Sequence, residues 1–430
     1  MSQFAAKSVC ILGRQPTLGL VELESLYGAE QIKPIKHGVL LDIPAGEINF
    51  KRLGGTLKVA KLLNVLPASD WKKIYKYLTE NIPRHLQHVP GGTFTLGVSL
   101  YGLELPVSKL NTDLLLLKKI IRAQGRSVRI VPNKTLELNS AQVLHNKLTR
   151  RGAWELLAIR NGSQTYLAQT FFVQDIEAYA ARDQARPKRD ARVGMLPPKL
   201  AQILINLAVG EIESAVGSRQ SAVKKLATSD LGLKTTRALR VLDPFCGTGV
   251  ILQEALLMGY DTIGSDIEPR MIEFSKTNLD WLLPRFDVQG SRFEIFQADA
   301  TNHKWQQQFD AVASELYLGR PLSELPVPQK LNEIVQDVNT ITKKFLSNIA
   351  AQIPKGTRLS LAVPAWRPNV IGLTYHKKGF VHLPVIDHLT DMGYNRIDFV
   401  HVKNDELIYF REDQIVAREL LVLERLGIRD

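Results

Sequence analysis

Val241-Leu-Asp-Pro-Phe-Cys-Gly-Thr-Gly249 is the stretch that decides the fold of this chain. It begins with two apolar residues typical of the end of a buried strand, and the acid Asp243 follows them. Gly247 and Gly249 let the backbone approach a ligand closely, and the helical pattern at 250–258 places the positive end of a helix dipole beside them. The stretch is neither a dinucleotide fingerprint, which needs a third glycine, nor a P-loop. It therefore predicts a nucleotide-type binding corner.

Strand and helix patterns alternate from residue 239 onward, which predicts a doubly wound α/β sheet. Ligands of such sheets bind at the carboxyl ends of the strands. Asp243, Asp266 and Asp299 each end one of three successive candidate strands. Asp266 lies 23 positions after Asp243, the spacing at which an acid accepts ribose hydroxyl protons, and Asp299 or the next backbone N–H, of Ala300, can contact an adenine edge.

The string D-P-F-C-G-T-G-V-I at 243–251 closely resembles motif I of class I S-adenosylmethionine (SAM) methyltransferases, in the branch that acts on exocyclic amines of nucleic-acid bases. The resemblance implies SAM as the cofactor. The SAM-binding residues that it implies in this half of the chain are Asp243, Pro244, Phe245, Gly247, Thr248, Gly249, Asp266, Ile267, Asp299 and Ala300.

The charged connector 182–202, which contains R-P-K-R-D-A-R and G-M-L-P-P-K-L-A-Q, resembles the segment that leads into the catalytic domain of THUMP-containing tRNA guanosine N2-methyltransferases (the guanosine-10 type of archaea and eukaryotes). In that family the segment packs beside the cofactor, which implies that Met195 and Pro197 contact SAM. Arg186, Lys188 and Arg189 are expected to contact RNA. Mixed charge and prolines are equally typical of a solvated linker, which is the alternative interpretation.

The fourth strand, Phe309-Asp-Ala-Val-Ala-Ser-Glu-Leu-Tyr-Leu-Gly319, departs from the family string F-D-x-V-x-(T/S)-D-P-P-Y-G. Glu315 takes the place of the acid, and Tyr317 carries an aromatic ring one position early. The resemblance implies that these two residues orient an exocyclic amine and stack on the extruded base. Three functions remain open: guanosine N2-methylation, methylation of another base amine (adenine N6, ribosomal RNA or DNA), and a catalytically silent SAM- and RNA-binding protein.

The first half of the chain is expected to form two α+β domains. The boundaries predicted by pattern and resemblance are a ferredoxin-like domain at 1–66, a THUMP RNA-binding domain at 67–175, a linker at 176–198 and a class I (Rossmann-like) SAM methyltransferase domain at 199–430. Asn161-Gly162 predicts a hairpin turn, and Ser140 is a candidate N-cap for a helix at 141–150. The candidate RNA contacts here are Lys118, Lys119, Arg122, Lys147, Arg150 and Arg151, although an ordinary solvated helix end has the same composition.

The composition sets the remaining limits. A net charge of +12 and a pI near 9.5 suit a polyanionic partner such as tRNA, although a generally basic protein remains the alternative. Cys10 and Cys246 are too few for a disulfide framework or a zinc cluster, and no metal is expected. No apolar run reaches the length of a membrane span, so we expect a cytoplasmic protein without a membrane partner. The polar stretch 217–240 is expected to be a mobile loop, and a small activating protein partner stays open.

Overall fold

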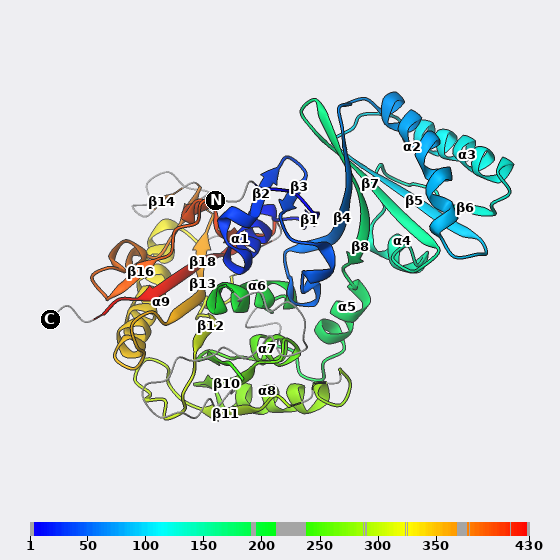
Figure 1. Cartoon of the computed structure of the whole chain (residues 1–430). Coiled ribbons are helices and arrows are strands. Elements are labelled where there is room, and N and C mark those ends of the chain that lie inside the picture. The colour runs from blue at the N-terminus through cyan, green and yellow to red at the C-terminus, as the bar shows by residue number, and fades with distance from the viewer. Residues whose placement is uncertain are drawn as a thin grey trace, which may run out of the picture. The chain divides into compact units, whose positions relative to one another are not determined.

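The computed structural model describes residues 4–190, 195–211, 238–286, 288, 290–322, 324, 326–367, 376–377, 379–412 and 414–427. Most of the stretch predicted to be a mobile loop, residues 217–237, lies outside them. The chain divides into two compact units (Figure 1). Unit 1 comprises Met1–Pro16, Ala29–Lys51 and Thr56–Tyr179, and unit 2 comprises Thr17–Gly28, Arg52–Gly55 and Ala180–Asp430.

Unit 1 is built on one continuous eight-stranded sheet of order β2-β3-β1-β4-β8-β7-β5-β6. Its strands are β1 (Ser8–Leu12), β2 (Ile32–Ile35), β3 (Gly38–Leu41), β4 (Thr56–Leu66), β5 (Phe94–Tyr101), β6 (Val128–Ile130), β7 (Ala153–Asn161) and β8 (Gln164–Val173). The long strand β4 pairs with β1 on one side and β8 on the other, so the sheet runs past residue 66 without a break. The predicted division into a ferredoxin-like and a THUMP domain at that residue stays a prediction.

Helices cover both faces of this sheet. The helices α2 (Trp71–His85) and α3 (Val107–Ala123) bury their apolar sides against Leu96 and Val98 of β5. The short helix α4 (Ser140–His145) and its flanking residues pack on the other face, where Gly97 leaves the space that they fill. A Cβ at Gly97 would lie 2.5 Å from Leu138 and 2.6 Å from Leu148, so only glycine permits this close packing.

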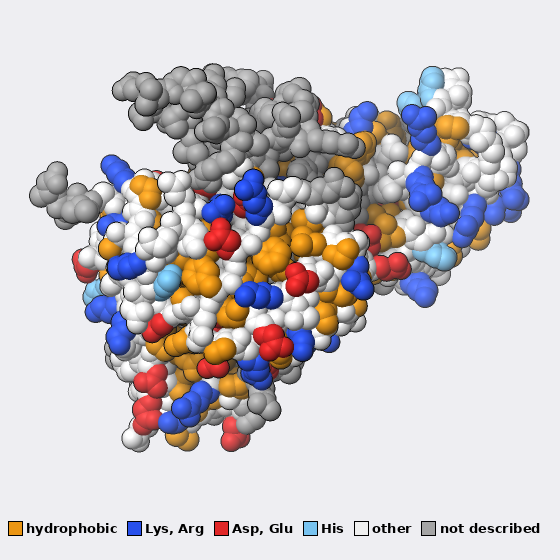
Figure 2. All heavy atoms as spheres, turned by 90° about the horizontal axis from the view of Figure 1, so that it is seen from below, with side chains coloured by type: hydrophobic (Ala, Val, Ile, Leu, Met, Phe, Trp, Pro, Cys, Tyr) orange, Lys and Arg blue, Asp and Glu red, His pale blue; other side chains and the backbone are white. Residues whose placement is uncertain are grey.

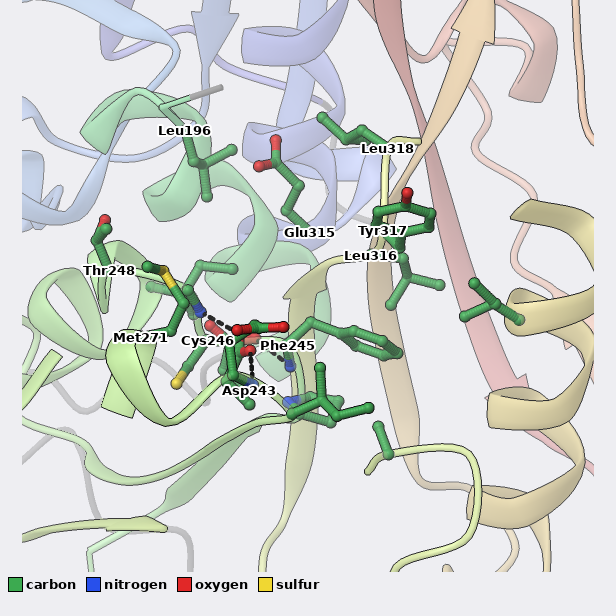
Figure 3. A pocket seen from close by; sticks show the side chains of 18 of the residues that line it. Leu196, Asp243, Phe245, Cys246, Thr248, Met271, Glu315, Leu316, Tyr317 and Leu318 are labelled. Carbon is green, nitrogen blue, oxygen red and sulfur yellow. Dashed lines mark hydrogen bonds between the residues drawn. The ribbon is translucent and has the colours of Figure 1, made fainter. Parts of the chain in front are cut away.

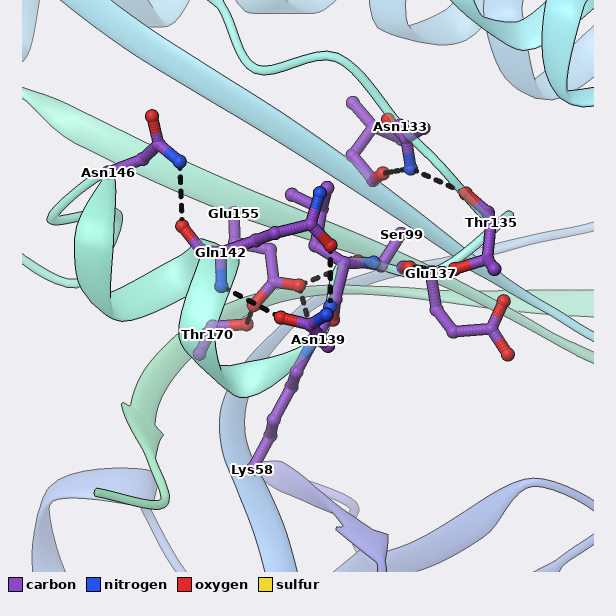
Figure 4. Close-up of polar contacts among 12 residues, drawn as sticks. Lys58, Ser99, Asn133, Thr135, Glu137, Asn139, Gln142, Asn146, Glu155 and Thr170 are labelled. Atoms are coloured by element: carbon purple, nitrogen blue, oxygen red, sulfur yellow. Dashed lines mark hydrogen bonds and ion pairs between the residues drawn. The ribbon is translucent and has the colours of Figure 1, made fainter. Parts of the chain in front are cut away.

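A buried polar cluster joins the strands of unit 1 (Figure 4). The ammonium of Lys58 forms an ion pair with Glu155 and donates to the carbonyl of Leu138 at 2.7 Å. The hydroxyls of Ser99 and Thr170 each donate to the Glu155 carboxylate at 2.6 Å. Both charges are thus compensated by hydrogen bonds from several strands, which is the condition under which a buried ion pair is tolerated.

Two local predictions in unit 1 have different outcomes. The hairpin is confirmed, since β7 and β8 pair antiparallel, but its turn is Gly162-Ser163, because Asn161 ends β7 and pairs with Gln164. The N-cap prediction is wrong by one residue. Asn139, rather than Ser140, accepts from the backbone N–H of Gln142, whose side chain in turn accepts from Asn139 and completes a capping box. The helix ends at His145, well before the predicted 150.

Unit 2 contains a ten-stranded mixed sheet whose parallel part has the order β11-β10-β9-β12-β13. Its strands are β9 (Arg240–Asp243), β10 (Asp261–Asp266), β11 (Phe293–Gln297), β12 (Ala311–Glu315), β13 (Arg358–Trp366), β14 (His376–Lys377), β15 (Phe380–Val381), β16 (Tyr394–Arg396), β17 (Ile408–Tyr409) and β18 (Val416–Arg425). The antiparallel strand β18 lies beside β13 and also pairs with β16 and β17. The predicted doubly wound sheet is thereby confirmed.

Helices enclose the sheet of unit 2 from both sides. One face packs on α9 (Pro328–Ala350), and the other packs on α6 (Pro198–Val209). The helices α7 (Val250–Leu257) and α8 (Pro269–Leu282) share a further apolar cluster with β11. The helix α5 (Ile176–Gln184) spans the boundary at which unit 1 ends. None of the helices in the described part of the chain combines the length and apolar character that a membrane span requires.

Two short N-terminal segments belong to unit 2 rather than to the unit that surrounds them in sequence. The carboxylate of Glu22, on α1 (Pro16–Tyr27), accepts from the backbone N–H groups of Gly54 and Gly55 at 2.9 Å and from the Asn206 amide at 2.7 Å. Burial raises the pKa of Glu22 to about 7, although these donors oppose the rise. A sequence boundary at residue 66 does not anticipate this arrangement, because its contacts join residues up to 184 positions apart.

Candidate active site

A cavity of about 570 Å³ opens at the carboxyl ends of the parallel strands of unit 2 (Figure 3). In that view Thr248 and Met271 lie at the left, Tyr317 lies at the right, and Glu315 lies above Asp243 in the middle. Most of the lining residues come from the ends of β9, β10, β11 and β12 and from the segment before α6, and a few come from α7, α8 and α9. This is the place at which a doubly wound sheet binds its ligand.

The glycine turn after β9 has the geometry that its sequence predicts. Gly247 (φ +49°) and Gly249 (φ +83°) both lie in the left-handed region, and α7 begins directly after Gly249. The N–H of Gly247 donates to Oδ2 of Asp266 at 2.9 Å, and its carbonyl accepts from Ser275 at 2.7 Å. A Cβ at Gly247 would meet nothing within 4 Å, so this side of the turn is open. A Cβ at Gly249 would lie 3.0 Å from Oγ of Ser275, so close packing adds to the preference for glycine that its positive φ already imposes.

Asp243 is the deepest acid of the cavity. It is 2% exposed, and its Oδ1 accepts from the hydroxyl of Ser314 at 2.6 Å and from the N–H of Phe245 at 3.3 Å. Burial raises the pKa of Asp243 to about 7, since the two hydrogen bonds only partly compensate the lost hydration. The Asp243 carboxyl therefore changes charge near neutral pH, and a cationic ligand group beside it would favour the ionised form.

The other two acids hold turns as well as line the cavity. Asp266 accepts from the N–H of Glu268 at 3.0 Å in addition to Gly247, and burial raises its pKa. The carboxylate of Asp299 accepts from the N–H and hydroxyl of Thr301 and from the Asn302 amide. Of the two adenine contacts that the sequence left open, this favours the backbone N–H of Ala300, because the Asp299 carboxylate is engaged in its own turn.

The reaction side of the cavity is formed by the end of β12 and the residues after it. Nε of Arg418, on β18, donates to Oε1 of Glu315. Burial raises the pKa of Glu315, and Arg418 acts against that rise. Leu316 is buried and its N–H donates to the Ala362 carbonyl at 2.9 Å, whereas the Tyr317 side chain is 40% exposed. The substituted motif thus presents one carboxylate and one accessible aromatic ring.

Nearly all of the predicted cofactor and catalytic residues lie together. Those that line the cavity are Met195, Asp243, Pro244, Phe245, Gly247, Thr248, Asp266, Ile267, Asp299, Ala300, Glu315 and Tyr317. Pro197 and Gly249 do not line it. Pro197 occupies the N-cap position of α6, and Gly249 occupies that of α7, so both shape the backbone that carries lining residues.

Sequence reasoning missed several lining residues. Glu268 is exposed and lies two positions after Asp266. A second acid in the turn after a strand that already ends in an acid is a sequence signal that could have indicated this residue. Met271 comes from α8, and Lys344 comes from α9, where helical periodicity gives no sign of a ligand. Arg320 directly follows the segment 315–319. The described residues hold no cluster of three or more His, Cys, Asp or Glu side chains arranged to bind a metal ion.

The candidate RNA contacts of unit 1 lie on its surface but on two different elements. Lys119 and Arg122 of α3 are exposed and Lys118 is partly buried, while Lys147, Arg150 and Arg151, which follow α4, are all exposed. Since α3 and α4 pack on opposite faces of the sheet, the two sets do not share a helix face. At the right-hand end of the view in Figure 2, Lys and Arg side chains are exposed and no acidic side chains are visible beside them.

The connector residues differ more from expectation. Arg186 is 3% exposed, so this structure does not present it to a phosphate. The ammonium of Lys188 lies 5.1 Å from the centre of the Phe274 ring and 3.9 Å from the Glu273 carboxylate, and its backbone pairs with Asn278 of α8. Arg189 is exposed. The connector is therefore packed on unit 2 at these positions rather than solvated throughout.

Comparison with known proteins accords with this geometry. Residues 235–365 match the family model of a methyltransferase domain. The matched residues all belong to unit 2. Curated proteins named tRNA (guanine(10)-N2)-dimethyltransferase are similar to parts of this chain. The protein of Methanothermobacter thermautotrophicus is 28% identical over 184 residues, which cover 42% of this chain and 43% of that protein.

Two further proteins of the same name match. That of Methanocaldococcus jannaschii is 25% identical over 52% of this chain and 54% of its own length. That of Pyrococcus abyssi is 36% identical over 20% of this chain and 18% of its own length. The resemblance predicted from the sequence is confirmed by these matches, although the chain spans about half or less of the length of the curated relatives it matches.

Proposed function

We propose that this chain is a SAM-dependent RNA methyltransferase that methylates the exocyclic N2 of a guanosine in tRNA. One observation carries the proposal: a single cavity is lined by the motif I turn on one side and by Glu315 and Tyr317 on the other. The names of the curated relatives support tRNA guanosine as the substrate.

The residues present fit SAM. The cavity is large enough for a nucleoside with an amino-acid tail, and the open side of Gly247 allows close approach of such a ligand. Asp243, Asp266 and the backbone of Ala300 would hold it, with carboxylates for its hydroxyl and cationic groups and an N–H for its base. When bound, SAM supplies an electrophilic methyl group.

The chain's own residues would prepare the nucleophile. Glu315 would accept a hydrogen bond from the exocyclic amine, which orients the nitrogen lone pair, and would take up the proton that the amine loses. The exposed ring of Tyr317 would stack on the extruded base. Leu316, which replaces a family proline, is fixed instead by burial and by its bond to Ala362.

Unit 1 would hold the body of the tRNA. We assign to it the role of the THUMP-containing half, in which exposed lysines and arginines contact phosphates and position the substrate without reading its sequence. The α3 and post-α4 sets would then make separate contributions, because they lie on opposite faces of the unit 1 sheet. Replacing each set by glutamine should weaken tRNA binding and reduce its salt dependence.

The experiment that tests the proposal uses purified protein, labelled SAM and tRNA transcripts, with nucleosides analysed by mass spectrometry. We expect N2-methylguanosine, and we expect a transcript with inosine at the modified position to be inert because inosine lacks the 2-amino group. Transfer to the inosine transcript would contradict N2 as the target. Formation of N6-methyladenosine would show that the target is the adenine amine and not the guanine amine. SAM binding without methyl transfer to any tRNA pool would indicate a catalytically silent protein.

A further inference from the structure

Arg418 is a buried cation that reaches the reaction side of the cavity from a distant part of the chain. It lies on β18, 103 positions after Glu315, and is 3% exposed. Its Nε donates to Oε1 of Glu315, and one terminal nitrogen donates to the side-chain oxygen of Gln414 at 3.3 Å. A buried arginine of this kind requires a partner, and the partner here is the candidate catalytic acid.

The sheet register determines this contact. Strand β13 lies between β12 and β18, with Glu315 paired to Ala362 and Ala362 paired to Leu420. Arg418 lies two residues from Leu420 and is therefore on the same face, where Ala362 provides only a methyl group. The guanidinium can thus reach Glu315 across β13. A small residue in the middle strand and a long one beyond it are both needed.

The contact occupies one oxygen of Glu315. No hydrogen bond joins Oε2 to any other residue in the described part of the chain, and the Glu315 side chain lines the cavity with 13% of its surface exposed. A carboxylate that lines a cavity and has one oxygen fixed by a cation has a restricted direction in which its other oxygen can accept a further donor.

We propose that Arg418 is a positioning residue of this site, which rests on the proposed function: it holds Glu315 as an oriented carboxylate whose free oxygen accepts the exocyclic amine. Arg418 itself does not line the cavity. Its role in the reaction is exerted through Glu315. The family acid is one methylene shorter, and Arg418 is the element of this chain that restrains the longer side chain.

The charges around Glu315 give this role a measurable signature. Asp243 on β9 is a second acid whose pKa Glu315 raises, and the cavity also contains the acids Asp190, Asp266, Glu268 and Asp299 and the cations Arg320 and Lys344. The cation that forms an ion pair with Glu315 in the described part of the chain is Arg418, which lies outside the cavity lining. Loss of its charge leaves the effect of burial unopposed, so the pKa of Glu315 should rise.

The matched control is Arg411 on the same hairpin. Its guanidinium lies 5.8 Å from the centre of the Tyr409 ring, and that of Arg418 lies 6.0 Å from the same ring. Arg411 donates to the Tyr409 hydroxyl at 2.9 Å and has no hydrogen bond to Glu315 among the described contacts. Arg411→Met therefore removes a comparable arginine without altering the catalytic acid.

The test is the pH profile of single-turnover methyl transfer to a tRNA transcript, with SAM affinity measured separately by calorimetry. For Arg418→Met we expect a rate about 10²-fold lower near neutral pH, an acid limb displaced upward by about one pH unit or more, and unchanged SAM affinity. Arg418→Lys should retain part of the rate, because it keeps the charge. Arg411→Met should keep the wild-type acid limb.

Two further outcomes separate the possible failures. In the Glu315→Gln background, Arg418→Met should cost little more, since the two residues act as a unit. If Arg418→Met folds poorly, the same comparison can be made with Arg418→Lys, measured with and without Glu315→Gln. A uniform loss of rate with an unshifted acid limb would overturn the positioning role. An inactive wild-type protein that binds SAM would instead overturn the proposed function.

Discussion

The two sides of the cavity differ in how far apart in sequence their interacting residues lie. The cofactor side comes from the ends of β9, β10 and β11, within residues 243–301, and each of these ends carries an acid close to its strand. The proposed reaction side depends on Glu315 and on its hydrogen bond from Arg418, which follows 103 positions later on an antiparallel strand. Local backbone geometry fixes the first side, whereas register across three strands fixes the second. A variant can therefore damage one side and spare the other.

The largest expected effect is on the reaction side alone. Glu315→Gln keeps the size of the side chain but removes the negative charge and the ability to take up a proton. We expect the rate of methyl transfer to fall by about 10²-fold or more, with SAM affinity changed by less than about twofold. Stopped-flow turnover and calorimetry on the same preparation check both values. A parallel loss of SAM affinity would show that the two sides are not separable.

Much of the cofactor side could be predicted because its signals are local. Gly247, Asp266 and Asp299 each end a strand or shape a turn, and the residue type alone indicates that role. Pro197 and Gly249 were assigned to the right segments, but a motif does not say which of its residues carry side chains into the cavity and which hold the backbone. Glycine at an N-cap with positive φ has a structural role of its own.

The remainder depends on contacts between residues far apart in sequence. Arg186 lies in a charged segment that is typical of a solvated linker, yet it is buried, and its neighbour Arg182 pairs with Glu254 at 2.8 Å across 72 positions. The Glu22 cluster joins α1 to α6 in the same way. Charge patterns predict exposure on average, and only the register and packing of distant elements show where a charge is instead compensated inside.

An intermediate effect is expected on the cofactor side from the pKa of Asp243, which is about 7. Because burial raises this pKa, the carboxyl is neutral below it and can attract the cationic groups of SAM only after it loses its proton. SAM affinity should therefore rise about tenfold between about pH 6 and about pH 7.5. Isothermal calorimetry across this range measures the change.

The control is Asp243→Asn, which keeps the shape of the side chain and does not titrate. Its affinity should be low and nearly independent of pH, apart from the ionisation of the ligand itself, which both proteins experience equally. An equal slope in the variant and the wild type would assign the pH dependence to SAM alone. Ionisation of Asp243 would then have no effect on SAM affinity.

The smallest expected effect tests a side-chain hydrogen bond between the two sides. Ser314 lies on β12 next to Glu315, but its hydroxyl donates to Asp243 on β9 at 2.6 Å. Because this bond stabilises the charged carboxylate, Ser314→Ala should raise the pKa of Asp243 further. SAM affinity near pH 7 should then fall about fivefold, with its midpoint moved to higher pH.

Ser360 is the matched control for that substitution, since it is buried on the neighbouring strand β13 and its hydroxyl has no hydrogen-bond partner among the described residues. Ser360→Ala should leave SAM affinity unchanged. If Ser314→Ala instead altered the acid limb of methyl transfer and spared SAM affinity, Ser314 would belong to the reaction side with Glu315. The role of Ser314 would then be determined by the strand on which it lies and not by the acid that accepts its hydrogen bond. The cofactor and reaction sides of the cavity would in that case be divided by strand, with all of β12 on the reaction side.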